Sequence, residues 1–193
     1  MKPIELIEAS PETLPGSFSD DLQFSKNWLC YHLKQIQNQN KKPFSIITAL
    51  GSWYGNLGIY LNSNHVKFRD LVLIDIDKNA LDVSRKLLGK ISQYRVTTIQ
   101  RDANDHKYKC SANQCVINTS CNDMELNGWF DKIPAGTLVA LQGRNSLQSI
   151  PTETETIADF NDLFPMSKTF ILDQTKLRDP ETSYIRFLKI GIK

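Results

Sequence analysis

The 193-residue sequence has no apolar stretch approaching the roughly 20 residues that a membrane-spanning helix needs. Its first residues, MKPIELIEASPETLPGSF, also lack the apolar core of a secretory signal peptide. We therefore predict a cytoplasmic protein without membrane contact. An excess of one charge is missing too, because 23 basic residues are matched by 21 acidic ones without a long single-sign block. An extended nucleic-acid-binding surface is not indicated, although nucleic acid is left open as a partner.

Cysteine is scarce, and its pattern indicates neither a disulfide framework nor a metal site. Cys30, Cys110, Cys115 and Cys121 are expected to be free thiols in a cytosolic chain. His106 and the last three cysteines form a loose cluster without the short C-x2-C spacing of structural zinc sites, so no metal is predicted. A nucleophilic role for Cys121 is disfavoured, since none of the three histidines is placed to pair with it.

Length and composition predict a single globular domain. The chain has 40% hydrophobic and 23% charged residues, which is ordinary for a folded protein, and its length suits one core. We divide it into an N-terminal leader and helix, 1–42, and a main domain, 43–193. The helix is expected over about 17–39, where apolar residues recur on one stripe. It either packs on the core, which we favour, or covers the site as a lid.

From Pro43 onward, short apolar runs alternate with amphipathic segments. Strands are predicted over 44–51, 70–77, 95–100, 114–120, 136–143, 168–177 and 183–193, and helices over 54–64, 78–90, 124–133 and 154–164. This alternation is typical of a parallel sheet covered on both faces. The last two strands have no helix between them and should form an antiparallel hairpin at one edge. The predicted fold class is therefore α/β, with a seven-stranded, mostly parallel sheet and a C-terminal hairpin.

Three local features refine this prediction. Asp77 should cap the helix that follows it, because its carboxylate can accept from the free amides of the first turn. Thr152 or Thr154 should open the helix over 154–164. The segment 101–113 is polar and lacks an apolar stripe, so a loop is expected where a crossover helix would normally lie.

Polar and glycine residues follow the predicted strands, at the edge where ligands bind in open parallel sheets. The first strand is followed by Gly51, Ser52, Trp53, Tyr54 and Gly55, the second by Asp75, the third by Asp102 and Ala103, and the fourth by Asn118, Thr119 and Asp123. Asp75 lies 20 residues beyond Gly55, the separation at which a strand-end acid reaches a ribose held over the first turn. Three such features in order predict an adenosyl or dinucleotide ligand.

The first turn, GSWYG, differs from a three-glycine loop because Trp53 occupies the position of the middle glycine. A bulky residue favours φ and ψ outside the left-handed region. We therefore expect a wider turn, with its backbone farther from the ligand.

The sequence from about Pro43 to Lys193 resembles the class I methyltransferases that depend on S-adenosylmethionine. ALGSWYGNL resembles their first motif, VLIDIDKNAL the second, IQRDAND the segment that meets adenine, CVINTSCNDM the fourth motif, and WFDKIPAGTLVALQG the helix and strand that follow. The segments GSWYG, INTS and IPAGTLVALQ are more specifically similar to compact, poorly characterised methyltransferase-like proteins of bacterial and phage genomes. The resemblance implies a Rossmann-like fold and S-adenosylmethionine as the cofactor.

The same resemblance implies roles for individual residues. Asp75 would contact the ribose, Asp102 the adenine, and Gly51 and Gly55 the remaining cofactor. The other predicted cofactor contacts are Ser52, Trp53, Tyr54, Ala103, Asn118 and Thr119. Asn118 and Asp123 are the catalytic candidates: Asn118 to position an amine or hydroxyl and Asp123 to act as a base, with Ser120 and Cys121 lining the pocket.

Two departures from the family pattern keep alternatives open. Ala49 stands where the first motif usually has an acid that holds the methionine ammonium, and Tyr54, Asn118 or Asp123 are expected to substitute for it. With Trp53, this departure supports a binding protein that has lost catalysis. A nicotinamide-dependent oxidoreductase is less favoured, because the Tyr-x3-Lys pair of its short-chain members does not occur. The expected acceptor is a small molecule or a macromolecule presented by a partner.

Overall fold

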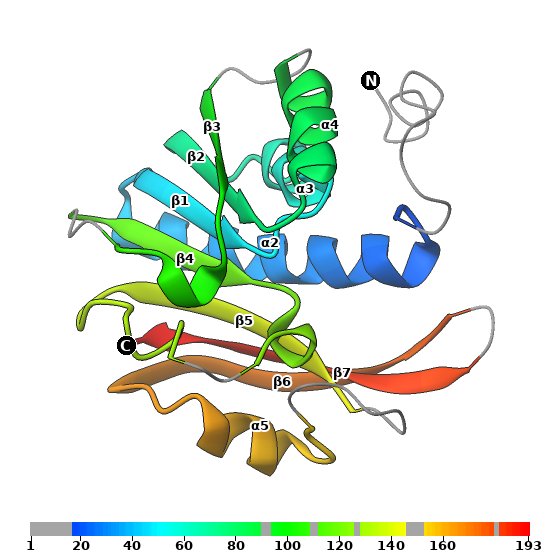
Figure 1. The fold of residues 1–193 in the computed structure, drawn as a ribbon. Helices are drawn as coiled ribbons and strands as arrows, with labels where there is room; N and C mark the ends of the chain where they lie inside the picture. Colours follow the sequence, from blue (N-terminus) through cyan, green and yellow to red (C-terminus); the bar gives the residue numbers. More distant parts are fainter. Residues whose placement is uncertain (1–16, 90–93, 109–111, 126–127, 146–152, 180–181) are drawn as a thin grey trace.

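A computed structural model describes residues 17–89, 94–108, 112–125, 128–145, 153–179 and 182–193. Its centre is a seven-stranded sheet in the order β3-β2-β1-β4-β5-β7-β6 (Figure 1). The strands are β1 (Phe44–Leu50), β2 (Phe68–Asp75), β3 (Arg95–Gln100), β4 (Gln114–Asn118), β5 (Leu138–Arg144), β6 (Lys168–Arg178) and β7 (Ser183–Ile192). The first five are parallel, and β7 runs antiparallel to both β5 and β6. The predicted α/β fold with a C-terminal hairpin is thus confirmed.

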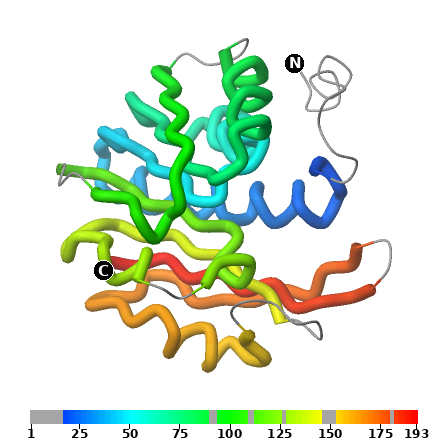
Figure 2. Tube along the Cα trace, in the orientation of Figure 1, coloured from blue at the N-terminus to red at the C-terminus, as the bar shows by residue number. Residues whose placement is uncertain are grey.

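Helices cover both faces of this sheet unequally. The helices are α2 (Asp20–Asn40), α3 (Asn56–Ser63), α4 (Lys78–Gly89) and α5 (Ile157–Leu163), with short 3-10 helices η1 (Ala103–Asp105) and η2 (Cys121–Asp123). In Figure 1, α3 and α4 lie beside β1 to β3, whereas α5 lies beside β6 and β7 at the other end of the sheet. Figure 2 shows the C-terminal strand returning between β5 and β6, which places the start of β7 beside the end of β5.

The core divides into two apolar clusters because alternate side chains of a strand point to opposite faces. Ile47 and Ala49 of β1 belong to the cluster beneath α2, α3 and α4. Leu50 belongs to the second cluster, which is rich in aromatic rings. That second face is covered by α5, the 3-10 helices and the turns before β5, which contribute the buried rings of Trp129, Phe130, Phe160 and Phe164.

The N-terminal helix is a packing helix whose first turns also reach the edge of the sheet. Leu29, Leu33 and Ile36 are buried in the first cluster, as the apolar stripe predicts. Ser25 fixes the helix to β5, because its hydroxyl donates to Gln142 Oε1 at 3.0 Å and its carbonyl accepts from Gln142 Nε2 at 2.9 Å. No helix among the described residues is long and apolar enough to cross a membrane.

One predicted helix cap is confirmed and another is wrong. The amides of Asn79 and Ala80 donate to Asp77 Oδ1 at 2.8 and 3.2 Å, so Asp77 caps α4 as expected. The last helix is instead opened by Thr156, which forms a capping box with Asp159. The hydroxyl of Thr154 accepts from Asn122 and donates to the Arg144 carbonyl, which leaves it unable to cap. Thr152 lies outside the described residues.

The helix predicted over 124–133 is wrong where the chain is described. Residues 128–133 form turns, in which Gly128 has a φ of +100° that no α-helix accommodates. The neighbouring Trp129 and Phe130 are both buried, a pattern that a helix with a single apolar stripe does not give. Residues 126 and 127 lie outside the described part. The loop expected over 101–113 is confirmed for its described residues, apart from the single turn of η1.

Candidate functional site

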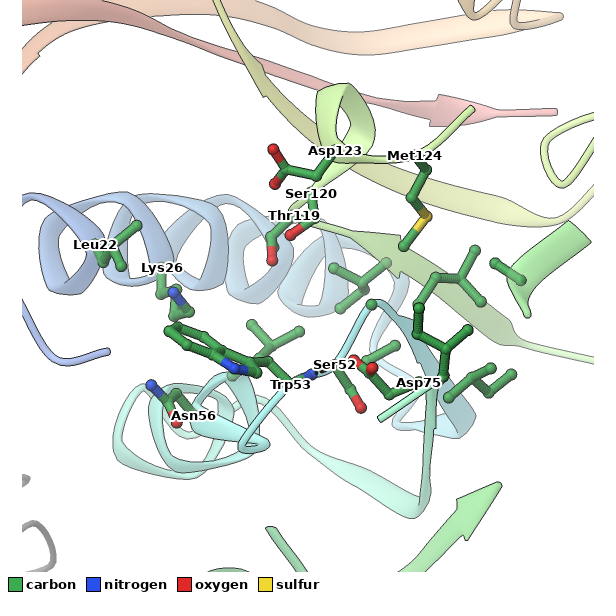
Figure 3. A pocket seen from close by; sticks show the side chains of 18 of the residues that line it. Leu22, Lys26, Ser52, Trp53, Asn56, Asp75, Thr119, Ser120, Asp123 and Met124 are labelled. Carbon is green, nitrogen blue, oxygen red and sulfur yellow. Dashed lines mark hydrogen bonds between the residues drawn. The ribbon is translucent and has the colours of Figure 1, made fainter. Parts of the chain in front are cut away.

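A cavity of about 850 Å³ opens at the carboxyl ends of β1, β2 and β4. The chain leaves β1 towards β2 on one side and reaches β4 on the other, so the cavity lies where the strand order reverses. Its volume is in the upper part of the range of small-molecule pockets, roughly 300–1,000 Å³. Figure 3 shows the turn after β1 on one side of this cavity and the loop after β4 on the other.

The turn after β1 forms one wall and requires glycine at its first position. Gly51 has a φ of +55°, and a Cβ there would collide with Cε of Met124 from the loop after β4. The turn closes through the Gly55 amide, which donates to the Ser52 carbonyl at 2.8 Å. The Met124 side chain therefore packs directly against the backbone at Gly51.

Trp53 adopts the left-handed conformation that the sequence was expected to avoid, with a φ of +46°. The expectation of a wider turn built on ordinary φ and ψ is wrong. The Trp53 amide donates to Asp75 Oδ2 at 2.7 Å, and this charge-assisted bond holds a conformation that costs roughly 1–2 kcal/mol for an L-residue. The indole lies against Tyr54, with ring centroids 4.7 Å apart, and 36% of Trp53 remains exposed.

Asp75 links this turn to the end of β2 and keeps acceptor capacity for a ligand. Its Oδ1 accepts from the Asp77 amide at 3.0 Å, while its Oδ2 accepts from Trp53. An ionised carboxylate offers about four acceptor positions, so two of them stay open beside the cavity that Asp75 lines. A ligand with two adjacent hydroxyls suits this arrangement.

An apolar wall continues from Asp75 to the end of β3. Leu50, Ile74 and Ala103 are buried in one core cluster and also line the cavity, which gives a flat aromatic group a hydrophobic surface. Asp102 lines the cavity beside them, and its carboxylate accepts from the Asn104 amide at 2.8 Å to open η1. Asp102 thus combines a local capping role with an exposed acceptor.

The loop after β4 forms the facing wall. Asn118 is fully buried and organises this loop, because its Oδ1 accepts from the Ser120 amide at 2.8 Å and its Nδ2 donates to Met124 Sδ at 3.3 Å. Thr119, Ser120 and Asp123 line the cavity instead, and Asp123 is exposed. Of the two catalytic candidates, Asp123 is therefore available to a ligand in the cavity and Asn118 is not.

The cysteines are placed as packing residues. Burial raises the pKa of the Cys121 thiol well above its ordinary value, with smaller opposing effects from Arg186, and the thiol lies 3.5 Å from the Asn118 carbonyl. Cys30 and Cys115 are likewise buried and free, and Cys110 lies outside the described part. Among the residues that the structure describes, no group of three His, Cys, Asp or Glu side chains is arranged to hold a metal ion.

The structure brings most of the predicted site residues together around one cavity. Those that line it are Gly51, Ser52, Trp53, Asp75, Asp102, Ala103, Thr119 and Asp123, together with Ala49 at the position of the family's missing acid. Tyr54, Gly55 and Asn118 do not line it. Gly55 is required for packing, because its φ is +73° and a Cβ there would lie 2.8 Å from Cβ of Ser84 on α4.

A second group of lining residues, from α2 and the start of β7, was not predicted from the sequence. This group includes Asp21, Lys26, Tyr184 and Arg186. The Tyr184 hydroxyl donates to Asp21 Oδ2 at 2.6 Å, which fastens α2 to the hairpin across the mouth of the cavity. One available signal was Arg186 itself, which with Lys189 is one of two charged residues inside the mostly apolar strand SYIRFLKIGI.

Comparisons with known proteins rest on structure alone. No family model matches the sequence, and no curated protein sequence matches it either. TehB from Haemophilus influenzae superposes with a TM-score of 0.63 at 9% identity, covering 83% of this chain and 61% of TehB. This chain therefore spans about three fifths of the length of TehB.

Two other solved structures are similar over more of their own length. Magnesium protoporphyrin IX methyltransferase from Synechocystis PCC 6803, solved with bound S-adenosylmethionine, has a TM-score of 0.63 at 11% identity, covering 97% of this chain and 90% of its own. An rRNA methylase from Streptococcus thermophilus has a TM-score of 0.57 at 14% identity, covering 92% of this chain and 100% of its own. At these identities the likeness concerns the fold, and the chain has the fold of the class I S-adenosylmethionine-dependent methyltransferases.

Proposed function

We propose that this protein is an S-adenosylmethionine-dependent methyltransferase acting on a small molecule or on an acceptor presented by a partner. The observation that carries the proposal is the Asp75 carboxylate, which lines the cavity at the strand-order reversal with two acceptor positions open. The solved structures of similar fold include methyltransferases, one of them with bound S-adenosylmethionine.

The residues present fit that cofactor at its nucleoside end. Asp75 would accept from the two ribose hydroxyls, the apolar wall of Leu50, Ile74 and Ala103 would hold the adenine ring, and Asp102 would accept from its edge. When bound, the cofactor supplies an electrophilic methyl group on a positively charged sulfur.

The amino-acid end of the cofactor needs another contact, because Ala49 stands where the family usually has an acid. Of the three candidates named from the sequence, Tyr54 and Asn118 do not line the cavity, whereas Asp123 does. We therefore assign one of two roles to the Asp123 carboxylate. It either contacts the ammonium of the cofactor or accepts a proton from the methyl acceptor. Thr119 and Ser120, on the same loop, orient the acceptor, and the buried Asn118 positions all three through its hydrogen bond to the Ser120 amide.

A nicotinamide cofactor fits the arrangement less well. The dinucleotide-binding sheet usually runs in the order 3-2-1-4-5-6 with parallel strands, whereas β7 here lies antiparallel between β5 and β6. Gly51, Gly55 and Gly58 form a G-x3-G-x2-G series akin to dinucleotide-binding turns. The later glycines serve packing, since a Cβ at Gly58 would lie 2.9 Å from Leu88 of α4. Neither Gly55 nor Gly58 lines the cavity.

Transfer of label from methyl-labelled S-adenosylmethionine tests the proposal. The protein is incubated with fractionated cell extract, and label is followed separately in small molecules, RNA and protein. We expect enzyme-dependent label in one fraction and its loss in Asp123→Asn. Cofactor binding without label in any fraction would support the non-catalytic alternative, and a protein that binds neither S-adenosylmethionine nor its demethylated product contradicts the proposal.

A further inference from the structure

Arg186 is a buried cation in the cavity wall without an ionic partner. Its residue is 7% exposed, its Nε donates to Ser25 Oγ at 3.0 Å, and its Nη2 donates to the Thr119 carbonyl at 2.7 Å. Among the described residues, no carboxylate lies within ion-pair distance of the guanidinium, and Nη1 has no hydrogen-bond partner. The hydrogen bonds of the guanidinium thus go to neutral oxygens, while the Asp123 carboxylate acts on its charge from beyond ion-pair distance, and the side chain lines the cavity.

Lys26 provides a second unpaired cation from α2. Its side chain lines the same cavity, and none of the ion pairs found among the described residues includes it. Burial and the charge of Arg186 lower the pKa of Lys26 to about 8, although Asp21 opposes the shift. The Asp21 carboxylate accepts from the Tyr184 hydroxyl and stays charged, but among the described residues it forms no ion pair with Lys26.

These two cations lie apart from the nucleoside end of the cavity. In Figure 3, Lys26 on α2 and Asp75 at the end of β2 lie on opposite sides of Trp53. Arg186 contacts the loop after β4 at Thr119, the loop to which we assign acceptor orientation. Two like charges held together in a poorly hydrated wall repel each other, and an anion bound between them removes that cost.

We propose that Lys26 and Arg186 bind a carboxylate or phosphate group of the methyl acceptor, so that the acceptor is an anionic small molecule. The inference rests on the proposed methyltransferase function. The planar guanidinium of Arg186 can donate two parallel hydrogen bonds to a carboxylate or phosphate, and Lys26 adds a second positive charge from α2. Carboxylates such as Asp21, Asp123 and Asp179 also line the cavity, so we expect the anion to bind only between Lys26 and Arg186.

A pair of probes that differ in charge but hardly in shape tests this site. Benzoate and benzamide are titrated into the protein loaded with S-adenosylhomocysteine, and binding is followed by ligand-observed NMR. We expect benzoate to bind at least tenfold more tightly than benzamide. Lys26→Met should reduce that preference severalfold, and Arg186→Gln should abolish it.

Lys34→Met is the matched control, because Lys34 lies on the same helix but donates to the His65 carbonyl at 2.8 Å and does not line the cavity. Thermal unfolding of each variant checks folding, and Lys26→Met carries the test if Arg186→Gln does not fold. Equal binding of benzoate and benzamide to the wild-type protein would overturn the proposal, as would an unchanged preference in folded Lys26→Met.

A second arm separates an acceptor anion from the carboxylate of the cofactor itself. Affinities for S-adenosylhomocysteine and for 5′-methylthioadenosine, which lacks the amino-acid group, are compared in the wild type and Lys26→Met. We expect both affinities to be unchanged, whereas a selective loss for S-adenosylhomocysteine assigns the cations to the cofactor and overturns the proposal. If the wild type binds no S-adenosylhomocysteine, the methyltransferase function fails, and the benzoate titration on the protein alone still decides the anion site.

Discussion

The two halves of the cavity are built from different parts of the chain. In the nucleoside half, around Asp75 and Asp102, the key hydrogen bonds join residues 22 or 2 positions apart. In the acceptor half, the bonds of Tyr184 with Asp21 and of Arg186 with Thr119 join residues 163 and 67 positions apart. The first half is set by consecutive strands and their turns, whereas the second forms only when α2 and the hairpin pack onto the sheet.

The two halves of the cavity also differ in their charged groups. Carboxylates in the nucleoside half accept from backbone amides and retain open acceptor positions, which suits hydroxyl groups. The acceptor half has two carboxylates, Asp21 and Asp123, but also two cations that form no ion pair among the described residues, Lys26 and Arg186, and these suit an anion. Substitutions that affect one half and spare the other are therefore the way to test this division.

The largest effect is expected at Asp75. In Asp75→Asn, affinity for S-adenosylhomocysteine should fall about 10- to 100-fold, because charge-assisted hydrogen bonds contribute about 1.5–3 kcal/mol. Asp77→Asn is the control, since asparagine caps helices as well as aspartate and Asp77 does not line the cavity. Calorimetry measures both, and equal affinities in the two variants would break the assignment of the nucleoside half.

A smaller effect on stability is expected at Lys26. The folded protein releases the Lys26 proton near pH 8, whereas the unfolded chain holds it to about pH 10.5. The unfolded state therefore binds more protons between these values, and wild-type stability should rise with pH across this window by about 1–3 kcal/mol relative to Lys26→Met. Arg186, Asp21 and Cys30 are the charged and titratable groups that act on Lys26.

Urea unfolding of both proteins at pH 7 and pH 10 measures this difference. Lys26→Met should also be the more stable protein at pH 7, because it removes a partly buried charge that has no ion-pair partner among the described residues. A difference between the two proteins that does not change with pH would place Lys26 in solvent and remove it from the acceptor half.

The smallest effect on stability is expected at Trp53. Trp53→Gly relieves the strain of the φ of +46° but adds the backbone entropy of glycine to the unfolded chain, so the free energy of unfolding should change by less than about 1 kcal/mol. Affinity for S-adenosylhomocysteine should nevertheless change severalfold, since Trp53 lines the cavity. Thermal unfolding and calorimetry check the two parts, and a variant that fails to fold would show Trp53 to be a core residue.

The sequence predicted the nucleoside half better than the acceptor half for a physical reason. Gly51, Asp75 and Asp102 end successive parallel strands, and the alternation of strands and helices is enough to bring such residues to one edge. Lys26 and Arg186 meet through the antiparallel return of β7 and the crossing of α2, which no local pattern encodes. The available sign for Arg186 was its position, as one of two charged residues, within a mostly apolar strand.

Local patterns also failed where long-range packing overrides them. The segment predicted as a helix over 124–133 contributes Trp129 and Phe130 to a core cluster with Phe160 and Phe164, and turns bury both rings where a helix would bury one. Trp53 takes a conformation typical of glycine because the Asp75 carboxylate binds its amide. The helix start at Thr156 was missed because Thr154 is engaged by Asn122 and Arg144.

Calorimetric titration of the wild-type protein with S-adenosylhomocysteine and, separately, with NAD tests the central claim most directly. The account predicts saturable binding of S-adenosylhomocysteine with one site per chain and no measurable binding of NAD, because β7 lies antiparallel between β5 and β6, which differs from the usual sheet order of dinucleotide-binding proteins. Binding of NAD without binding of S-adenosylhomocysteine would contradict it.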